Sequence, residues 1–264
     1  MVFAKKSLGQ NFLMHPQTAE RIVDAAKLPL DAVVLEVGPG TGMLTRALLK
    51  NVRKVIAVEA DDALAPELAE TFHAEVEEGR LDIRHADIRH FDTQEIKEPY
   101  HVVANIPYYI TGEIIRQFLS AEHKPESMTL LVQKEVAERI ARNGGKESLL
   151  SLSVTAYGTP EYCFTVPRGA FRPAPSVDSA VLAIRNIRQD TFSSREAEDR
   201  FFSILRAGFA HKRKRLAKNL EVVAAAPSIQ TAMERTGLGA NTRPEDVSIE
   251  TWKQLAHELP AVRA

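Results

Sequence analysis

The chain has 264 residues, of which 44% are hydrophobic and 26% are charged, as is ordinary for globular proteins. No apolar stretch approaches the roughly 20 residues of a membrane-spanning helix, and no apolar run follows Lys5 and Lys6 as in a secretory signal. The single cysteine, Cys163, excludes a disulfide framework and a cysteine-ligated zinc site, so we expect a cytoplasmic protein without a metal. With a net charge of −1, any nucleic-acid binding must come from local segregation of charge.

The first part of the chain alternates between strand-like and helix-like segments. Short apolar runs predict strands at 33–37, 55–59, 81–85, 102–105 and 128–133, and the segments between them predict helices at 44–50, 62–74 and 113–120. This alternation predicts a parallel α/β sheet with right-handed crossovers. Two later strands, at 162–166 and 180–184, are joined by the rigid segment 171–175 and predict a hairpin-like closing edge.

The pattern becomes helical near Arg188. Helix caps are predicted at Ser193 or Ser194, at Ser228 before a helix over 229–236, and at Ser248 before a helix over 249–259. Pro244 suits a first helical turn. We therefore expect a Rossmann-like α/β domain over residues 1–188 and a small all-helical domain over residues 189–264.

A glycine-rich turn at 36–42 lies directly between the first strand and a helix. Its glycines permit a tight turn and close approach of a ligand, although the spacing G-x-G-x-G differs from the dinucleotide form. Glu59 ends the second strand, 21 residues after Gly38, where a carboxylate can accept both ribose hydroxyls of a nucleoside. Each feature alone is explained by an ordinary turn or a solvated acid, but their joint spacing favours a nucleoside site.

Asp87 follows the third strand and can accept a hydrogen bond from an adenine amino group. Alone this signal is weak, because acids are common in loops. Together with the glycine-rich turn and Glu59, it predicts an adenosine-containing ligand that needs no pyrophosphate clamp. S-adenosylmethionine fits that description better than NAD.

The segment Asn105-Ile106-Pro107-Tyr108 ends the fourth strand, at the edge where α/β enzymes place their chemistry. The N6 amine of adenine is a poor nucleophile, and two acceptors aimed at its hydrogens would return electron density to the nitrogen. The Asn105 side-chain oxygen and the Ile106 or Pro107 carbonyl can do this, and Tyr108 can stack on the base. The alternative is a turn with a buried aromatic ring.

Taken in order, these motifs resemble the ribosomal RNA adenine dimethyltransferases, most closely the bacterial KsgA/RsmA branch that acts on the small subunit. Further landmarks of the resemblance are the segments 7–13, 131–136 and 171–179. The resemblance implies a class I methyltransferase fold, S-adenosylmethionine as cofactor, and dimethylation of two adjacent adenosines in the 3′-terminal hairpin of small-subunit rRNA. We expect the substrate to be a pre-ribosomal particle and the protein to be a monomer without a membrane partner.

The resemblance also assigns roles to single residues. It places cofactor contacts on the N-terminal arm, the glycine-rich turn and the strand ends, at Asn11, Leu13, Gly38, Gly40, Glu59, Asp87 and Asn105. It places the catalytic set on Asn105, Pro107, Tyr108 and Phe171, with the two aromatic rings stacking on the flipped-out base. The segment 10–12 is expected to fold over the cofactor. Tyr109 stands where family members frequently have asparagine.

Residues 206–218 carry six basic side chains and no acidic one: Arg206, Lys212, Arg213, Lys214, Arg215 and Lys218. A solvated helix face is the ordinary explanation, but beside an adenine-modifying site we expect phosphate contacts and a steep dependence of affinity on salt. Further basic residues that could extend this surface are Lys5, Lys6, Arg139, Arg142 and Lys146.

Three other functions are compatible with parts of the sequence. A resistance-type methyltransferase of large-subunit rRNA shares the Asn105–Tyr108 chemistry, but the Leu8-Gly9 pair, the 133–135 segment and the helical tail favour the small-subunit enzyme. A non-catalytic ribosome-assembly factor is disfavoured by the complete set of site residues. A nicotinamide dehydrogenase is disfavoured by the glycine spacing.

Overall fold

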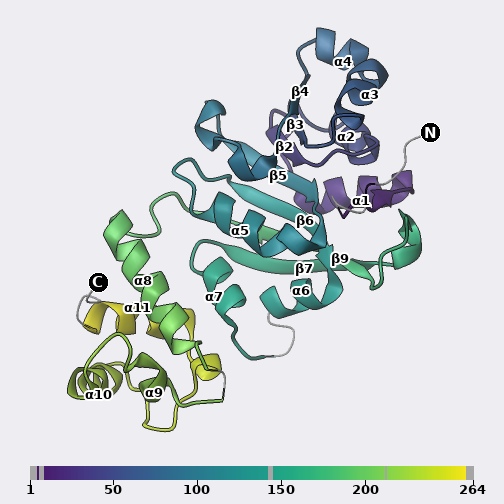
Figure 1. Cartoon of the computed structure of the whole chain (residues 1–264). Coiled ribbons are helices and arrows are strands. Elements are labelled where there is room, and N and C mark those ends of the chain that lie inside the picture. The colour runs from purple at the N-terminus through teal and green to yellow at the C-terminus, as the bar shows by residue number, and fades with distance from the viewer. Residues whose placement is uncertain (1–4, 6–8, 142–144, 212, 260–264) are drawn as a thin grey trace. The chain divides into compact units, whose positions relative to one another are not determined.

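The computed structural model describes residues 5, 9–141, 145–211 and 213–259 (Figure 1). The chain divides into two compact units, one of Met1–Ala141 with Gly158–Gln189 and the other of Arg142–Tyr157 with Asp190–Ala264. The change after Gln189 lies next to the expected boundary after residue 188. The segment Arg142–Tyr157, expected in the first domain, is part of the second unit, because its helix packs against that unit's long helix.

The first unit is built on a seven-stranded sheet with the order β4-β3-β2-β5-β6-β9-β7 (Figure 1). Five strands are parallel, namely β2 (Val33–Val37), β3 (Lys54–Glu59), β4 (Leu81–His85), β5 (Tyr100–Asn105) and β6 (Ser127–Gln133). Strand β9 (Ser179–Arg185) is antiparallel to both β6 and β7 (Thr159–Val166). The predicted α/β class is confirmed, and the predicted closing pair is the antiparallel β7–β9 edge.

The strand order places a ligand crevice at the carboxyl end of β2. The chain continues from β2 to β3 on one side, and β5 pairs with β2 on the other, so the crossovers diverge at this point. Ligands of open α/β sheets bind at such a switch point. Every residue of β2 is buried, as expected for a parallel strand that is covered on both faces.

Helices of the first unit complete its core. They are α1 (Pro16–Ala26), α2 (Met43–Leu48), α3 (Leu64–Thr71), α4 (His73–Glu77), α5 (Thr111–Leu119) and α6 (Lys134–Ile140). Apolar side chains of α1 and α2, such as Ile22 and Leu48, share a core cluster with Val34 and Val103 of the sheet. The single helix predicted over 62–74 is two helices, because the backbone leaves the helical conformation at the buried Phe72.

A second, very small sheet ties the N-terminal arm, whose described residues are 5 and 9–15, to the rest of the first unit. Strand β1 (Phe12–Leu13) pairs antiparallel with β8 (Phe171–Arg172), and the Met14 amide donates to the Ala170 carbonyl at 2.9 Å. These strands are too short for any periodicity in sequence. The pairing brings residues from both ends of the first unit together.

The second unit is helical, with α7 (Leu149–Thr155), α8 (Arg195–Gly208), α9 (Leu216–Leu220), α10 (Ala226–Arg235) and α11 (Ile249–Glu258). Ser194 and Ser248 are N-caps as predicted, since their side chains accept from the amides of Ala197 and Thr251. Ser228 is not a cap. Helix α10 begins two residues earlier, with a proline in its first turn, so Ser228 lies inside it.

Gly208 allows α8 to approach α11 closely. A Cβ atom at this position would lie 2.3 Å from Cη2 of Trp252, whose side chain is fully buried. We expect Gly208→Ala to destabilise the helical unit by about 1–3 kcal/mol through overpacking. Trp252 is the only tryptophan, so its fluorescence during urea unfolding reports on this unit.

Gly239→Ala is the matched control, because the nearest atom to a Cβ there is 4.0 Å away. This variant should stay within about 0.5 kcal/mol of the wild type. Equal unfolding curves for both variants would show that the contact between Gly208 and Trp252 does not limit packing.

Candidate active site

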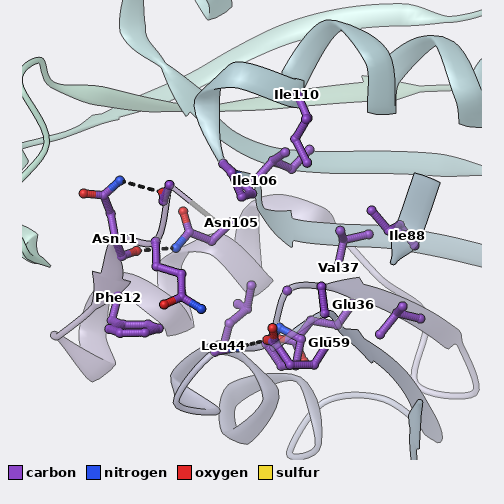
Figure 2. A pocket seen from close by; sticks show the side chains of 18 of the residues that line it. Asn11, Phe12, Glu36, Val37, Leu44, Glu59, Ile88, Asn105, Ile106 and Ile110 are labelled. Carbon is purple, nitrogen blue, oxygen red and sulfur yellow. Dashed lines mark hydrogen bonds between the residues drawn. The ribbon is translucent and has the colours of Figure 1, made fainter. Parts of the chain in front are cut away.

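A pocket opens at the carboxyl ends of β2, β3 and β5 (Figure 2). It is lined by parts of the segments 9–13, 36–44, 58–60, 86–89 and 105–110. The structure thus brings together seven residues predicted to hold a cofactor, namely Asn11, Leu13, Gly38, Gly40, Glu59, Asp87 and Asn105. Pro107 and Tyr108 line the same pocket.

The glycine-rich turn requires glycine at two positions for steric reasons. Gly40 and Gly42 have φ values of 59° and 78°, in the left-handed region that disfavours other residues. A Cβ at Gly42 would lie 2.4 Å from the ring of Phe72, and one at Gly40 would lie 3.0 Å from the ring of Phe12. The turn therefore packs tightly between α3 and the N-terminal arm.

Glu59 is held by the backbone at the end of β3. Its side chain is nearly buried, its Oε2 accepts from the Gly40 amide at 3.0 Å, and its Oε1 accepts from the Asp61 amide at 2.9 Å. Burial raises the pKa of this carboxyl, although the two backbone N–H groups favour its charged form. Each oxygen keeps a further lone pair with which to accept a hydroxyl.

Glu36 is a buried acid to which the sequence patterns assigned no role. It is 1% exposed, lines the pocket, and neither of its oxygens has a hydrogen-bond partner within the described part of the chain. Burial raises its pKa to about 8; the nearby polar groups of Thr45 oppose this shift, and the neighbouring charge of Glu59 adds to it. The signal in the sequence was an acid inside an otherwise apolar strand.

Asp87 lies at the edge of the pocket. Its carboxylate accepts from the Arg89 amide at 2.9 Å and pairs with the Arg89 guanidinium at 2.6 Å. These hydrogen bonds hold the pKa of Asp87 below its usual range, so the side chain is ionised and can act only as an acceptor.

Asn105 is oriented by the N-terminal arm. Its Nδ2 donates to the Asn11 carbonyl at 3.0 Å, and its Oδ1 accepts from none of the described residues (Figure 2). The Pro107 carbonyl accepts from the Ile110 amide at 3.2 Å, whereas the Ile106 carbonyl has no such partner among the described residues. Of the two carbonyls considered from the sequence, Ile106 is therefore the better acceptor for a ligand.

The aromatic residues of the site differ in exposure. Tyr108 is half-buried, and its hydroxyl bonds to Oγ of Ser179 at 2.5 Å, which fixes the ring. Burial raises the pKa of this hydroxyl. Tyr109 is exposed at the pocket, and its ring lies against Gly9.

The expectation that Phe171 presents its ring to a base does not describe this structure. Phe171 is 2% exposed, belongs to the core cluster with Leu13 and Val181, and is not among the residues lining the pocket. The physical reason is the β1–β8 pairing, which sets Phe171 opposite Leu13 and turns its ring inward.

The basic residues expected to hold RNA lie in the helical unit, with the exception of Lys212, which is outside the described residues. Arg206, Arg213, Lys214 and Arg215 are exposed, and Lys218 is exposed but pairs with Glu221. Of the further basic residues, Lys5 pairs with Asp61 and Asp62, and Lys146 pairs with Glu245. Arg139 is exposed, and Lys6 and Arg142, like Ser7 and Leu8, are outside the described residues.

The described part of the chain contains neither a metal-binding cluster nor a membrane-spanning helix. No group of three or more His, Cys, Asp or Glu side chains among the described residues is placed to hold a metal ion. No helix in the same part of the chain has the length and apolar character to cross a membrane.

Glu36→Gln tests the protonation of the buried acid. The folded pKa of about 8 lies above the ordinary value of 4.5, so the folded state keeps a proton that the unfolded state releases between these values. The contribution of protonated Glu36 to the free energy of unfolding is greatest below about pH 4.5. It declines as the pH rises and is lost above about pH 8. We expect the variant to be more stable than wild type at about pH 8, by on the order of 1–3 kcal/mol.

The measurement is urea unfolding at several pH values, with Glu67→Gln on the exposed face of α3 as the control. Stability should depend less on pH in Glu36→Gln than in the control. The same pH dependence in both variants would mean that Glu36 is ionised in the folded protein.

Comparisons with known proteins identify the family to which this chain belongs. The model of the family Ribosomal RNA adenine dimethylase matches residues 1–260. The Ribosomal RNA small subunit methyltransferase A of Dehalococcoides mccartyi is 43% identical over 262 residues, covering 97% of this chain and 88% of its own. The protein of the same name from Fusobacterium nucleatum is 36% identical over 256 residues, covering 95% of this chain and 96% of its own.

Solved structures show the same fold. The 23S rRNA methyltransferase ErmE has a TM-score of 0.76 and 29% identity, covering 94% of this chain and 99% of its own. A dimethyladenosine transferase from Plasmodium falciparum has a TM-score of 0.79 and 24% identity, covering 92% of this chain and 95% of its own, and supports the fold alone. The match of the family model over nearly the whole chain, together with these relatives, shows that this chain belongs to the ribosomal RNA adenine dimethylase family.

Proposed function

We propose that this chain transfers methyl groups from S-adenosylmethionine to the N6 atoms of two adjacent adenosines in the 3′-terminal hairpin of small-subunit rRNA. The observation that carries the proposal is the orientation of Asn105, whose amide nitrogen is occupied by the Asn11 carbonyl so that its oxygen is the acceptor for a substrate. We further propose that it acts as a cytoplasmic monomer on a pre-ribosomal particle.

The pocket fits S-adenosylmethionine through its own residues. The buried carboxylate of Glu59 is fixed by two backbone amides and suits the two ribose hydroxyls. The glycine-rich turn lines the pocket and would let the backbone approach the ligand closely, and the ionised Asp87 suits the adenine amino group. When bound, the cofactor supplies an electrophilic methyl group.

The residues of the 105–108 segment prepare the substrate amine. The Asn105 Oδ1 and Ile106 carbonyl would accept the two N6 hydrogens, so that the nitrogen lone pair is directed toward the methyl group. Pro107 fixes the backbone with φ at −54°, and Tyr108, held by Ser179, offers a ring for stacking. No base is needed before transfer, because the proton becomes acidic once the nitrogen is methylated and cationic.

The relatives favour the small-subunit reaction over the large-subunit alternative. The proteins named small subunit methyltransferase A are 36% and 43% identical to this chain, whereas ErmE is 29% identical. The complete pocket with its oriented Asn105 favours an enzyme over a non-catalytic assembly factor. An assembly role could coexist with catalysis.

Methyl transfer from labelled S-adenosylmethionine to small- and large-subunit precursors tests the proposal. We expect N6,N6-dimethyladenosine in the small-subunit RNA only, identified by mass spectrometry of digested nucleosides. Tyr108→Ala should weaken binding of the RNA base by about 1–3 kcal/mol, because the stacking on the ring is lost. Tyr108→Phe keeps the ring and should keep most of the activity. Methylated cytosine, or a product confined to large-subunit RNA, would contradict the proposed function.

The exposed basic residues of the helical unit are proposed to contact phosphate. Reversing Arg213, Lys214 and Arg215 to glutamate should weaken RNA binding. The slope of log affinity against log salt should become shallower by about one for each phosphate group that the protein no longer neutralises. Affinity for S-adenosylmethionine should not change.

The control reverses Lys27, Lys50 and Lys97, exposed residues of the first unit, and so changes the net charge by the same amount. Its salt slope should stay close to that of the wild type. If both triple variants change the slope equally, overall charge rather than the 213–215 segment holds the RNA.

A further inference from the structure

Asp61 is a buried acid that does not line the pocket. It follows β3 by two residues, is 2% exposed, and its carboxylate accepts from Nζ of Lys5 at 2.7 Å, Nε2 of Gln10 at 2.9 Å and the Ala63 amide at 3.0 Å. Burial opposes its ionisation, but these donors hold its pKa at about 2. The ionised side chain therefore binds two separate residues of the N-terminal arm.

The arm is held on both sides of Asn11. Before it, Gln10 is bound by Asp61, and after it, Phe12 and Leu13 pair with β8. The carbonyl of Asn11 between these attachments accepts from Nδ2 of Asn105. A continuous set of contacts thus runs from Asp61 through Gln10 and Asn11 to the catalytic amide.

The Asn11 carbonyl matters because the side-chain amide of Asn105 has two orientations of similar shape, which exchange its oxygen and its nitrogen. With Nδ2 bound to Asn11, the oxygen of Asn105 is available to the substrate amine. In the opposite orientation Asn105 would present N–H groups to the N6 hydrogens, and two donors cannot bond to each other.

We propose that Asp61 is a positioning residue for methyl transfer, which anchors the arm through Gln10 so that the Asn11 carbonyl fixes the orientation of Asn105. The inference rests on the proposed function of Asn105. It concerns the Asp61 side chain alone. The backbone amide of Asp61, which binds Glu59, is the same in every substituted protein.

Asp61→Asn removes the charge and keeps the size of the side chain. We expect kcat for methyl transfer to fall by about 10- to 100-fold, as for a misplaced catalytic group, while KM for S-adenosylmethionine changes by less than about threefold. Asp62→Asn is the control, since Asp62 binds the same Lys5 but is 78% exposed and makes no bond to Gln10. Equal kcat in wild type and Asp61→Asn would overturn the proposal.

A double-mutant cycle separates positioning from general destabilisation. Gln10→Ala should lower kcat in the wild type but not in an Asn105→Ser background, because the oriented amide is already lost there. Additive effects would overturn the proposal. Circular dichroism spectra of all variants establish that they are folded.

A spectroscopic measurement does not depend on the reaction. The side-chain amide signals of Asn105 in ¹⁵N-labelled protein should shift or broaden in Asp61→Asn and stay in place in Asp62→Asn. Unchanged signals in Asp61→Asn would overturn the inference even if the RNA substrate were wrong, whereas absent methylation by the wild type would contradict only the proposed function.

Discussion

The site depends on one constraint: polar groups that are buried at the ends of the parallel strands must find hydrogen-bond partners. Glu59 is nearly buried, and its two oxygens are bonded by amides from the glycine-rich turn and from the segment after β3. An unpaired buried carboxylate is costly, so these amides stabilise both the acid and the two loops that supply them. The shape of this end of the pocket follows from this arrangement.

The N-terminal arm closes the other side of the pocket by the same physical means. Its attachment is polar at Asp61 and combines backbone pairing with apolar packing at β8. Between these points the backbone of Asn11 is oriented well enough to act as an acceptor. The Asn11 carbonyl is thus held in place by contacts of its neighbours in the chain, with Asp61 on one side and with β8 on the other.

Much of the sheet could be predicted because most of its parallel strands are short, largely apolar runs. The predicted strands at 33–37 and 81–85 coincide with β2 and β4, and Glu59 and Asn105 stand at strand ends as expected. Helix α1 was missed although its buried residues, such as Ala19, Ile22 and Ala26, have helical spacing. The arm before it has no periodicity of its own.

The predictions that differ from the structure concern residues whose neighbours come from distant parts of the chain. Phe171 stands among prolines that suggest an exposed loop, yet a two-residue strand pair turns it into the core. The segment holding α7 interrupts the sheet in sequence but packs with the helical unit. An acid inside an apolar strand marks Glu36 in the sequence, but its raised pKa and the contacts of Asp61 with Lys5 and Gln10 depend on tertiary burial and could not be predicted.

The β1–β8 pairing also has a consequence for the order in which the protein is made. Phe12 pairs with Arg172, so the arm must wait for a segment that is synthesised about 160 residues later. A nascent chain that ends after β6 already has the glycine-rich turn, Glu59 and Asn105, but it cannot yet fasten the arm at β8. The pocket therefore reaches its final form only when the first unit is almost completely synthesised.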